Sequence, residues 1–552
     1  MNTHQRHRSV SIPPYLPLAE KITWDLDDGD GANRKFRRAI FSKTPNLFSK
    51  SLANIYRDLY LNKGERDANL FLLEVDEGIN PGSFNEGSLN LGASNSSLKE
   101  DAKKRVDACF RLTQLPQKYQ NDIKSLYKSL AFYADRFLVQ APKVKGGNYQ
   151  SAILRLLDEQ WWRKELRKIH KRKLELFAIK LGSVHRHASL YVSPQTLQCY
   201  LVQQQSNKEF MEQVVLENEE GDEFTLQQLM ETSVANPRNR RNELMCRCAG
   251  FEEFAKKANH IALFLTLTCP SRMHPRYSST GHANPNYDET SPREANDYFN
   301  NIWKNMRSKF GRDGITFYGL RVVEPQHDAT PHWHFMFFTE KQFQTTVEDI
   351  FRNYALKDSP DEKGADKHRF TSVAIDWSRG SATGYIAKYI AKNIDGAHLD
   401  QDLYGNDAAD SALRVRAWAS TWGIRQFQQF GGPPVSVWRE LRRCKNVPEG
   451  VLKEAFEAAD QGDWQTYVEL LGGCNIKVKD IPIKLEKVWS DKLGKYGEPL
   501  GYQVVGITDG TNTVTTRIHE WKIKTSPIIP EHTPPKPQAG GCAGLSYLEF
   551  CQ

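Results

Sequence analysis

The stretch Pro331-His-Trp-His-Phe-Met-Phe-Phe338 decides the fold, because an apolar, strand-like run begins with two histidines at alternate positions. Alternate residues of a strand point to one face, so His332 and His334 share a face and Trp333 lies on the other. A lone His-x-His is most often a pair of surface residues. Here both imidazoles stand at the entrance of an apolar strand, where polar atoms need a partner. Two imidazoles bind Mn or Zn readily and Mg more weakly, so this stretch predicts a divalent metal site on a sheet.

A hard oxygen ligand would complete such a site for phosphate chemistry. Glu324 closes the preceding predicted strand and is the candidate third ligand. Gln326, His327 and Asp328 lie close enough in the sequence to compete with it. The predicted cofactor is therefore a divalent metal, Mg or Mn, held by the two histidines and Glu324.

From residue 261 onward, strand-like and helix-like segments alternate. Apolar runs predict four strands, at 261–268, 315–323, 332–338 and 370–376. The other segments predict three helices, at 291–310, 341–355 and 378–395. Ser291-Pro-Arg-Glu294 forms a capping box, and Gly396 can end the last helix. This β-α-β-β-α-β-α order predicts an α+β fold, with a central antiparallel sheet of ferredoxin-like or RNA-recognition-like type and helices on one face.

Mainly helical regions are expected to flank this sheet at both its N-terminal and C-terminal sides. We expect six regions: 1–110 with a mixed pattern, 111–260 mainly helical, basic and DNA-binding, 261–400 with the sheet and the catalytic motifs, 401–475 helical with basic and aromatic residues, 476–525 small and β-rich, and 526–552 a tail. Asp509-Gly510 predicts a hairpin turn. The Pro/Gly-rich composition of the tail predicts disorder.

Two tyrosines lie one helical turn apart in Tyr385-Ile-Ala-Lys388-Tyr389-Ile-Ala-Lys392. Residues four apart share one face of a helix, about 6 Å apart along its axis. The isoleucines and alanines between them make a better buried stripe, which leaves the tyrosines for a functional face. Lys388 and Lys392 each follow a tyrosine by three positions. They can steady a phenolate or a phosphate, and help is needed because a free phenol has a pKa of about 10.

The histidine and tyrosine motifs together predict an enzyme that cuts a phosphodiester and keeps the broken end on its own side chain. Attack of a phenol on phosphorus expels a 3′-hydroxyl and leaves a 5′-phosphotyrosine, a bond that can be resealed without ATP. A second tyrosine allows a second cut while the first link persists. That logic suits rolling-circle replication.

The charge distribution favours nucleic acid as the partner. The chain has 75 Lys and Arg against 67 Asp and Glu, a net charge of +8. A basic run at 161–173 is, taken alone, best explained as a solvated helix face. The second basic region, 414–443, is interleaved with aromatic residues and predicts contact with single-stranded nucleic acid, through neutralised phosphates and stacked bases. Its candidate DNA-binding residues are Arg414, Arg416, Trp418, Trp422 and Arg425.

Other features of the composition indicate an intracellular protein. Nine cysteines at irregular spacing fit reduced thiols. No apolar run reaches the roughly eighteen residues of a membrane span, and the first residues lack an apolar signal core. We therefore expect the cytoplasm of a bacterial host and no membrane partner.

Three segments resemble the motifs of HUH endonucleases, in the order found in rolling-circle replication initiators. They are Phe264-Leu-Thr-Leu-Thr-Cys-Pro270, Pro331-His-Trp-His334 and Gly384-Tyr-Ile-Ala-Lys-Tyr-Ile-Ala-Lys392. More widely, from Trp161 to Arg443, the chain resembles the gene A replication proteins of temperate tailed phages. Further similar segments are Tyr191-Val-Ser-Pro194 and Arg416-Ala-Trp-Ala-Ser-Thr-Trp-Gly-Ile-Arg-Gln-Phe427.

This resemblance implies an HUH-type sheet, with His332 and His334 as metal ligands and Tyr385 and Tyr389 as nucleophiles. It implies a site- and strand-specific nick in origin DNA, covalent attachment through the first tyrosine and a joining step through the second. It also implies a host replicative helicase as a partner. Glu324 lies outside the shared motifs, so its role is predicted from position alone.

Other classes remain open. A conjugative or mobilisation relaxase uses the same chemistry, although relaxases usually carry three histidines and place the tyrosine near the N-terminus. A non-catalytic origin-binding protein would hold the same DNA without a covalent adduct. A structural metal protein of phage assembly would need no tyrosines near its metal.

Overall fold

The computed structural model describes residues 16–26, 31–79, 91, 93–114, 122–397, 400–401 and 405–525. Over these residues the protein is mixed α+β, mostly helical, with three small antiparallel sheets. The predicted tail, 526–552, lies outside the described residues. In the described part of the chain, no helix is both long enough and apolar enough to cross a bilayer.

The central sheet has five strands in the order β6-β3-β5-β4-β7, and all neighbours are antiparallel. The strands are β3 (His260–Thr268), β4 (Tyr318–Pro325), β5 (Pro331–Glu340), β6 (Phe370–Ala374) and β7 (Phe427–Phe430). Four of them confirm the predicted strands, with β4 beginning at Tyr318 rather than at residue 315. The fifth, β7, was not expected, and it pairs with the outer edge of β4.

Helices cover both faces of this sheet, which corrects the expectation that they lie on one face. On one face α12 (Pro292–Arg312) and α13 (Gln344–Ala355) share a core with the apolar strand residues Leu263, Leu265, Trp333, Phe335 and Phe337. On the other, α11 (Pro237–Lys257) and α15 (Ala382–Ile394) share a core with Ala262, Phe264, Leu320, Met336 and Phe338. Both alternating sets of strand residues are apolar, so both faces must be shielded from water.

Helix starts and ends in this part follow local sequence signals. Ser291 caps α12 with its side chain, and Glu294 completes the predicted capping box. Gly396 has a φ of +70° directly after α15, where its backbone N–H bonds to the carbonyl of Ala391. The short elements nearby are η2 (Ser271–Met273), η3 (Lys341–Phe343) and α14 (Ala365–His368).

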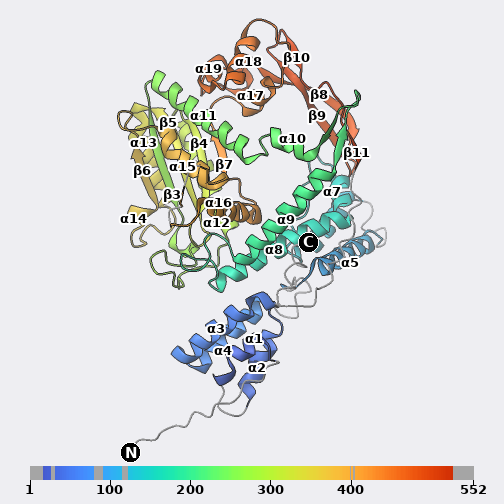
Figure 1. Cartoon of the computed structure of the whole chain (residues 1–552), viewed down its shortest axis with the longest axis vertical. Helices are drawn as coiled ribbons and strands as arrows, with labels where there is room; N and C mark the ends of the chain where they lie inside the picture. Colours follow the sequence, from blue (N-terminus) through green and yellow to red (C-terminus); the bar gives the residue numbers. More distant parts are fainter. Residues whose placement is uncertain are drawn as a thin grey trace, which may run out of the picture.

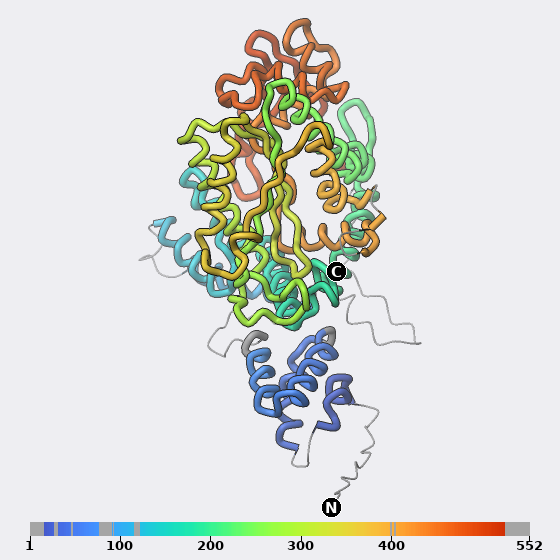
Figure 2. Tube along the Cα trace, turned by 90° about the vertical axis from the view of Figure 1, so that its left-hand side faces the viewer, coloured from blue at the N-terminus to red at the C-terminus, as the bar shows by residue number. Residues whose placement is uncertain are grey.

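Two helical clusters precede the sheet (Figures 1 and 2). The first lies at the N-terminal end and comprises α1 (Leu18–Ile22), η1 (Trp24–Leu26), α2 (Ala32–Phe41), α3 (Asn46–Lys63) and α4 (Glu65–Ile79). The second comprises α5 (Asn95–Thr113), α6 (Ile123–Asp135), α7 (Tyr149–Leu156) and α8 (Glu159–Lys180). The end of α8 packs into the first cluster through Phe177, Ala178 and Leu181.

The C-terminal part returns to helices and then to strands. Its helices are α16 (Ala408–Trp422), α17 (Val435–Leu441), α18 (Val451–Gln461), α19 (Trp464–Leu470) and η4 (Val478–Asp480). A second sheet consists of β8 (Lys484–Leu493), β9 (Pro499–Thr508) and β10 (Thr513–Thr515). The predicted Asp509-Gly510 turn is confirmed between β9 and β10.

A third sheet joins segments that lie far apart in the sequence. Helix α9 (Pro194–Gln213) leads into the hairpin of β1 (Val215–Glu217) and β2 (Glu223–Thr225), and α10 (Leu226–Thr232) follows. Strand β11 (Lys522–Thr525) pairs antiparallel with β1. Figure 1 shows this sheet beside β8 and β9, so the C-terminal strands reach back to the middle of the chain.

Candidate active site

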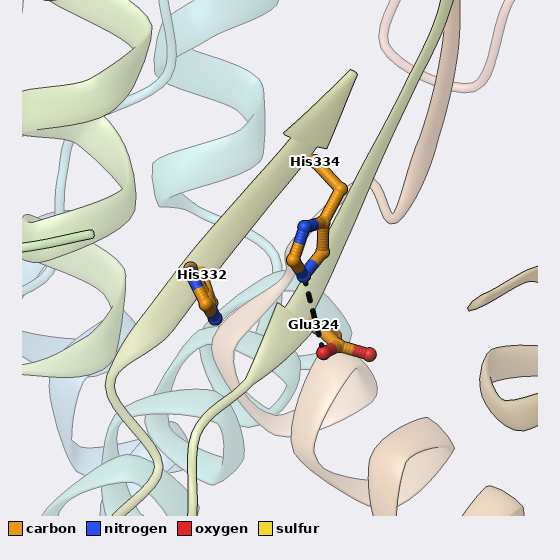
Figure 3. A group of neighbouring side chains, drawn as sticks. All are labelled: Glu324, His332 and His334. Atoms are coloured by element: carbon orange, nitrogen blue, oxygen red, sulfur yellow. Dashed lines mark hydrogen bonds and ion pairs between the residues drawn. The ribbon is translucent and has the colours of Figure 1, made fainter. Parts of the chain in front are cut away.

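The register of β4 and β5 brings one carboxylate and two imidazoles together (Figure 3). Glu324 lies directly opposite His332 across the strand pair, and His334 is two residues further along the same face. One ligand atom from each of the three residues lies within 4.8 Å of the other two, and Nε2 of His334 is 3.3 Å from Oε1 of Glu324. This is the predicted set of three, and Glu324 and His334 are both buried.

Two threonines on β3 orient the imidazole rings. Thr266 lies opposite His334 and Thr268 opposite His332 in the β3–β5 register. Their hydroxyl oxygens are 3.0 Å from His334 Nδ1 and 3.1 Å from His332 Nε2, respectively. Hydrogen bonds from a second ring nitrogen fix the orientation of metal-binding histidines. We did not predict these two residues, although their i, i+2 spacing in an apolar strand matches that of the histidines.

The electrostatics of the group fit a divalent cation. Burial opposes the charge on Glu324, but the Lys392 ammonium and the two imidazoles hold the pKa of its carboxyl well below the ordinary value. Burial and the neighbouring His334 lower the pKa of His332 well below that of a free imidazole. An ionised carboxylate beside a neutral imidazole provides the lone pairs that Mg, Mn or Zn would use. The three residues therefore fit the predicted metal.

The tyrosine helix α15 packs against the same face of the sheet. Ile386 and Ile390 are fully buried, as the sequence pattern predicted. The ring centroid of Tyr389 lies 4.1 Å from that of His334 and 5.2 Å from that of Phe264. Tyr385 is 47% exposed, and its ring lies 6.1 Å from Phe264. Both phenols are thus on the site side of the helix, with Tyr389 beside the histidines and Tyr385 one turn further out.

The environment of Tyr389 keeps its phenol protonated in the absence of other charges. Burial, and secondly the negative charge of Glu324, raise the pKa of Tyr389 to about 12. Activation of this hydroxyl as a nucleophile therefore needs additional positive charge near its oxygen.

Of the two lysines, the structure brings Lys392 into the site. Its ammonium is 3.2 Å from Oε2 of Glu324, and it lies 5.3 Å from the ring centroid of Tyr191. Lys388 is on the exposed side of α15. Lys392 therefore neutralises a candidate metal ligand in this structure, whereas Lys388 remains accessible to solvent or a ligand.

Asn393 and Gln426 are site residues that we did not predict. Nδ2 of Asn393 is 3.3 Å from Oε2 of Glu324 and donates to the carbonyl of Tyr389 at 2.7 Å. Nε2 of Gln426 donates to Oδ1 of Asn393 at 3.0 Å. These contacts link the carboxylate, the tyrosine helix and the segment before β7. No local pattern marks them, because the three meet only through the tertiary fold.

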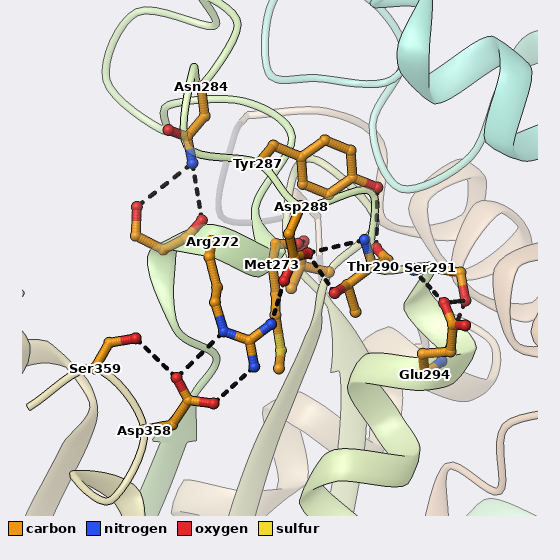
Figure 4. Close-up of polar contacts among 12 residues, drawn as sticks. Arg272, Met273, Asn284, Tyr287, Asp288, Thr290, Ser291, Glu294, Asp358 and Ser359 are labelled. Atoms are coloured by element: carbon orange, nitrogen blue, oxygen red, sulfur yellow. Dashed lines mark hydrogen bonds and ion pairs between the residues drawn. The ribbon is translucent and has the colours of Figure 1, made fainter.

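The residues that competed with Glu324 have other positions. Asp328 is fully buried, and Nδ1 of His274 lies 3.0 Å from its Oδ2. His274 lies in the segment that connects β3 to α12, and polar contacts hold this segment in place (Figure 4). Arg272 in that segment donates to both carboxylate oxygens of Asp358, at 3.2 Å and 2.7 Å, and also contacts Asp288. This network shapes the end of the sheet next to His332.

Trp418 and Trp422 are buried and not available for stacking, which corrects their predicted DNA-binding role. They are 0% and 1% exposed and belong to the core between the sheet and α12. Nε1 of Trp418 donates to the carbonyl of Ala329 at 2.9 Å, in the turn between Glu324 and His332. The indole thus holds the turn that joins two candidate ligands, and aromatic spacing alone could not distinguish a core face from a binding face.

The predicted arginines fall into two kinds. Arg414 donates to Asp410 at 2.7 Å and to the Ser189 hydroxyl at 2.8 Å, so its guanidinium has protein partners. Burial and the positive charges of Arg416 and Arg425 lower the pKa of Arg240. Arg416 and Arg425 therefore place positive charge near Arg240, and Nε of Arg425 also donates to the carbonyl of Phe427 at 3.2 Å.

The fold and the site define an α+β protein with a largely buried Glu-His-His group that could hold a metal, with Tyr389 beside it and Tyr385 one helical turn further out. The model of the family "Bacteriophage replication gene A protein (GPA)" matches residues 96–397, more than half of the chain. The chain therefore belongs to the bacteriophage replication gene A protein family.

Known relatives agree with this assignment. The chain is 39% identical over 396 residues to "Replication protein" of Haemophilus phage HP1, covering 70% of this chain and 50% of the relative. It is 36% identical over 426 residues to "Replication gene A protein" of Escherichia phage P2, covering 73% and 55%. It is 32% identical over 394 residues to "Probable replication endonuclease from prophage-like region" of Salmonella typhimurium, covering 67% and 48%.

These matches span about half the length of each relative. No solved structure matches the chain.

Proposed function

We propose that this protein is an HUH endonuclease that nicks one strand of a replication origin and remains joined to the new 5′ end. The observation that carries the proposal is the shared position of two features on one face of the central sheet. Tyr389 lies 4.1 Å, ring to ring, from His334, which belongs to the Glu324, His332 and His334 group. The strand order β6-β3-β5-β4 and the relatives named as replication proteins support the same reading.

In the first step, the Tyr389 hydroxyl attacks the scissile phosphorus. A P–O bond to the phenol oxygen forms, the P–O3′ bond breaks, and the products are a 5′-phosphotyrosine and a free 3′-hydroxyl. The phenol gives up one proton and the departing 3′ oxygen gains one, so the step is balanced. We assign this cut to Tyr389, and not to the first tyrosine as the resemblance implies, because the ring of Tyr389 lies 4.1 Å from that of His334 and Tyr385 is one turn further out.

A divalent metal bound by the two histidines and Glu324 would polarise the phosphate oxygens and offset charge that builds in the transition state. Lys392 and Asn393 keep the carboxylate in place from the tyrosine helix. Lys388, on the exposed side, is positioned to meet a phosphate.

The second tyrosine provides a second attack without release of the first DNA end. Tyr385 is half-exposed on the same helix face, so it can take a later phosphodiester while Tyr389 is still esterified. The freed 3′-hydroxyl can then attack the first phosphotyrosine link and reseal that strand. This sequence would both initiate and terminate rolling-circle replication.

Arg416 and Arg425, whose positive charges lie near Arg240, are our candidates for holding the DNA strand at the site. The proposed partners are origin DNA, single-stranded or locally melted, and a host replicative helicase. The proposed location is the cytoplasm of the bacterial host, where such DNA would be replicated.

The test is a covalent adduct. Supercoiled DNA of the replicon that encodes this chain is incubated with protein and Mn²⁺ or Mg²⁺, denatured, and digested for peptide mapping. We expect DNA linked through its 5′ end to Tyr389 or Tyr385, and no adduct after chelation. If the variant with both Tyr385→Phe and Tyr389→Phe still forms the adduct, the proposal fails. Binding of the DNA with no adduct under any condition would favour a non-catalytic origin-binding protein.

A further inference from the structure

A basic groove outside the tyrosine helix is lined by residues of α8, α9 and α16. Figure 1 shows how these three helices are arranged. Its volume is about 670 Å³. Five cationic residues of α8 line it: Arg163, Lys164, Arg167, Lys168 and Lys171. The other lining residues are polar and uncharged: Gln160, Gln203, Ser420 and Thr421. No carboxylate and no aromatic ring is among the described residues that line this groove.

Helix geometry turns these five residues into one stripe. They occupy positions i, i+1, i+4, i+5 and i+8, so they follow one face of α8 over two turns, with about 6 Å between turns. The opposite face is fixed in the core by Trp162, Leu166 and His170, all buried. The helix therefore cannot rotate so as to turn this basic face away from the groove.

The groove is also firmly connected to the catalytic region. Arg172 of α8 donates to the carbonyls of Thr421 at 3.0 Å and Trp422 at 2.9 Å, at the end of α16. The same helix α16 carries Trp418, which holds the turn between Glu324 and His332. One helix, α16, thus lines the groove and also contacts the turn between two candidate metal ligands.

The cations of the groove are close enough to repel one another. Burial, and secondly the positive charge of Arg163, lower the pKa of Arg167. Nε of Arg163 is buried and has no hydrogen-bond partner among the described residues. Lys168 contacts Glu165, which compensates part of the charge. Like charges this close on one helix face repel one another modestly, and a bound anion would offset that repulsion.

We propose that this basic groove binds the sugar–phosphate backbone of DNA that runs on from the tyrosine site, without reading its sequence. The repeat of the stripe suits successive phosphates of one strand. The amides and hydroxyls of the lining add neutral hydrogen-bond donors to phosphate oxygens. Without an aromatic ring the groove has no stacking platform, which favours backbone contact over base contact. The proposal rests on the proposed function, since it assumes DNA at the tyrosine site.

The test compares two variants of equal charge in the full chain. The groove variant changes Arg163, Lys164, Arg167, Lys168 and Lys171 to Gln. The control variant removes five exposed cations elsewhere, changing Lys304, Arg307, Arg312, Lys477 and Lys479 to Gln. Affinity for random-sequence DNA, duplex and single-stranded, is measured by fluorescence anisotropy between about 50 and 200 mM salt.

We expect the groove variant to bind roughly 10²-fold more weakly at the lowest salt, and its log affinity against log salt to be less steep by about 3–5. The control should keep the slope of the original protein. The form of DNA that loses more affinity identifies the form that occupies the groove. An unchanged slope in the groove variant, or an equal loss in the control, would overturn the proposal.

Two further measurements distinguish failure of this proposal from misfolding of a variant and from failure of the proposed nicking function. A charge-preserving variant, Arg163→Lys with Arg167→Lys in the original protein, should bind DNA as tightly as the original protein. Circular dichroism should show that both Gln variants are folded. Formation of the tyrosine adduct on a short single-stranded oligonucleotide that reaches only the catalytic site should persist in the groove variant. If neither the original protein nor any variant forms the adduct while the slope of log affinity against log salt still differs in the groove variant, the proposed nicking function fails. In that case the proposed DNA binding by the groove is supported.

Discussion

Lys392 and Glu324 form a buried ion pair that joins the tyrosine helix to a candidate metal ligand. The ammonium lies 3.2 Å from Oε2, and the two side chains are 8% and 5% exposed. Removing one partner of such a pair leaves an uncompensated charge in the interior. The pair therefore couples the position of α15, and of both phenols on it, to the charge state of the candidate metal-binding group.

Lys392→Met should destabilise the metal-free protein by about 3–5 kcal/mol, because Glu324 would be left buried without a counter-charge. Adding Glu324→Gln to this variant should restore most of the loss, since neither charge then remains. Thermal unfolding in the presence of a chelator measures both effects. Mn²⁺ should raise the Tm of Lys392→Met more than that of the original protein. An equal rise in both would show that Lys392 and the metal do not compensate the same carboxylate.

Tyr389→Phe should reduce the first cut by at least about 10³-fold, whereas Tyr385→Phe should leave it within about 10-fold. The reason is that Tyr389 lies beside His334 and Tyr385 is one turn further out. Single-turnover cleavage of an origin oligonucleotide measures the first cut, and strand transfer to a second oligonucleotide measures the second. Equal loss in the two single variants would contradict this order of use.

Asn393→Ala should lower the affinity for Mn²⁺ by about 10–100-fold, the usual effect of losing a residue that orients a metal ligand. Asn393 contacts Glu324 and is in turn held by Gln426. Calorimetric titration with Mn²⁺ is the measurement. The matched control is Lys388→Gln, on the exposed side of the same helix, which should leave the affinity unchanged.

The free energy of unfolding of the metal-free protein should fall as the pH is lowered from about 7.5 to about 5.5. The folded pKa of His332 is below the unfolded value of about 6.5, so the unfolded chain binds the extra proton in this range. His332 therefore contributes a loss of up to about 1.4 kcal/mol per pH unit. Urea denaturation of His332→Gln should show a smaller fall, and His282→Gln, an exposed control, should behave like the original protein.

Trp418→Phe should destabilise the fold by about 1–3 kcal/mol, because the buried carbonyl of Ala329 loses its hydrogen-bond donor. It should leave DNA affinity unchanged at temperatures well below unfolding. Arg425→Gln, at an exposed position, should do the reverse, weakening DNA binding with little change in Tm. Anisotropy and thermal unfolding on the same samples separate the two, and a large affinity loss in Trp418→Phe would argue against its core role.

Local sequence patterns were sufficient to predict the parts of the fold that bury a continuous apolar face. The runs that became β3 and β5, the capping box of α12 and the buried isoleucines of α15 all carry their signal within a few residues. The position of Glu324 followed from its place at the end of a strand next to the His-x-His strand. These inferences needed only strand and helix periodicity.

The remaining elements depend on contacts that no short segment contains. β7 has two glutamines in four residues and becomes a strand only because the edge of β4 is open to it. β1, β2 and β11 are three or four residues long and stabilise one another across the chain. The spacing of Trp418 is compatible with packing in the core and with stacking on a base. In the folded protein it packs in the core. Asn393 meets Glu324 only once β4 and α15 are assembled.

The pairing of β11 with β1 has a consequence for the time course of biosynthesis. Lys524 and Glu217, which form an ion pair across this sheet, are 307 positions apart. At ~5–20 residues per second, a ribosome would take roughly 15–60 s to reach the later strand after making the earlier one. During that interval the β1–β2 hairpin exposes an unpaired edge, which leaves a nascent chain open there to capture by a chaperone or by another unfinished copy.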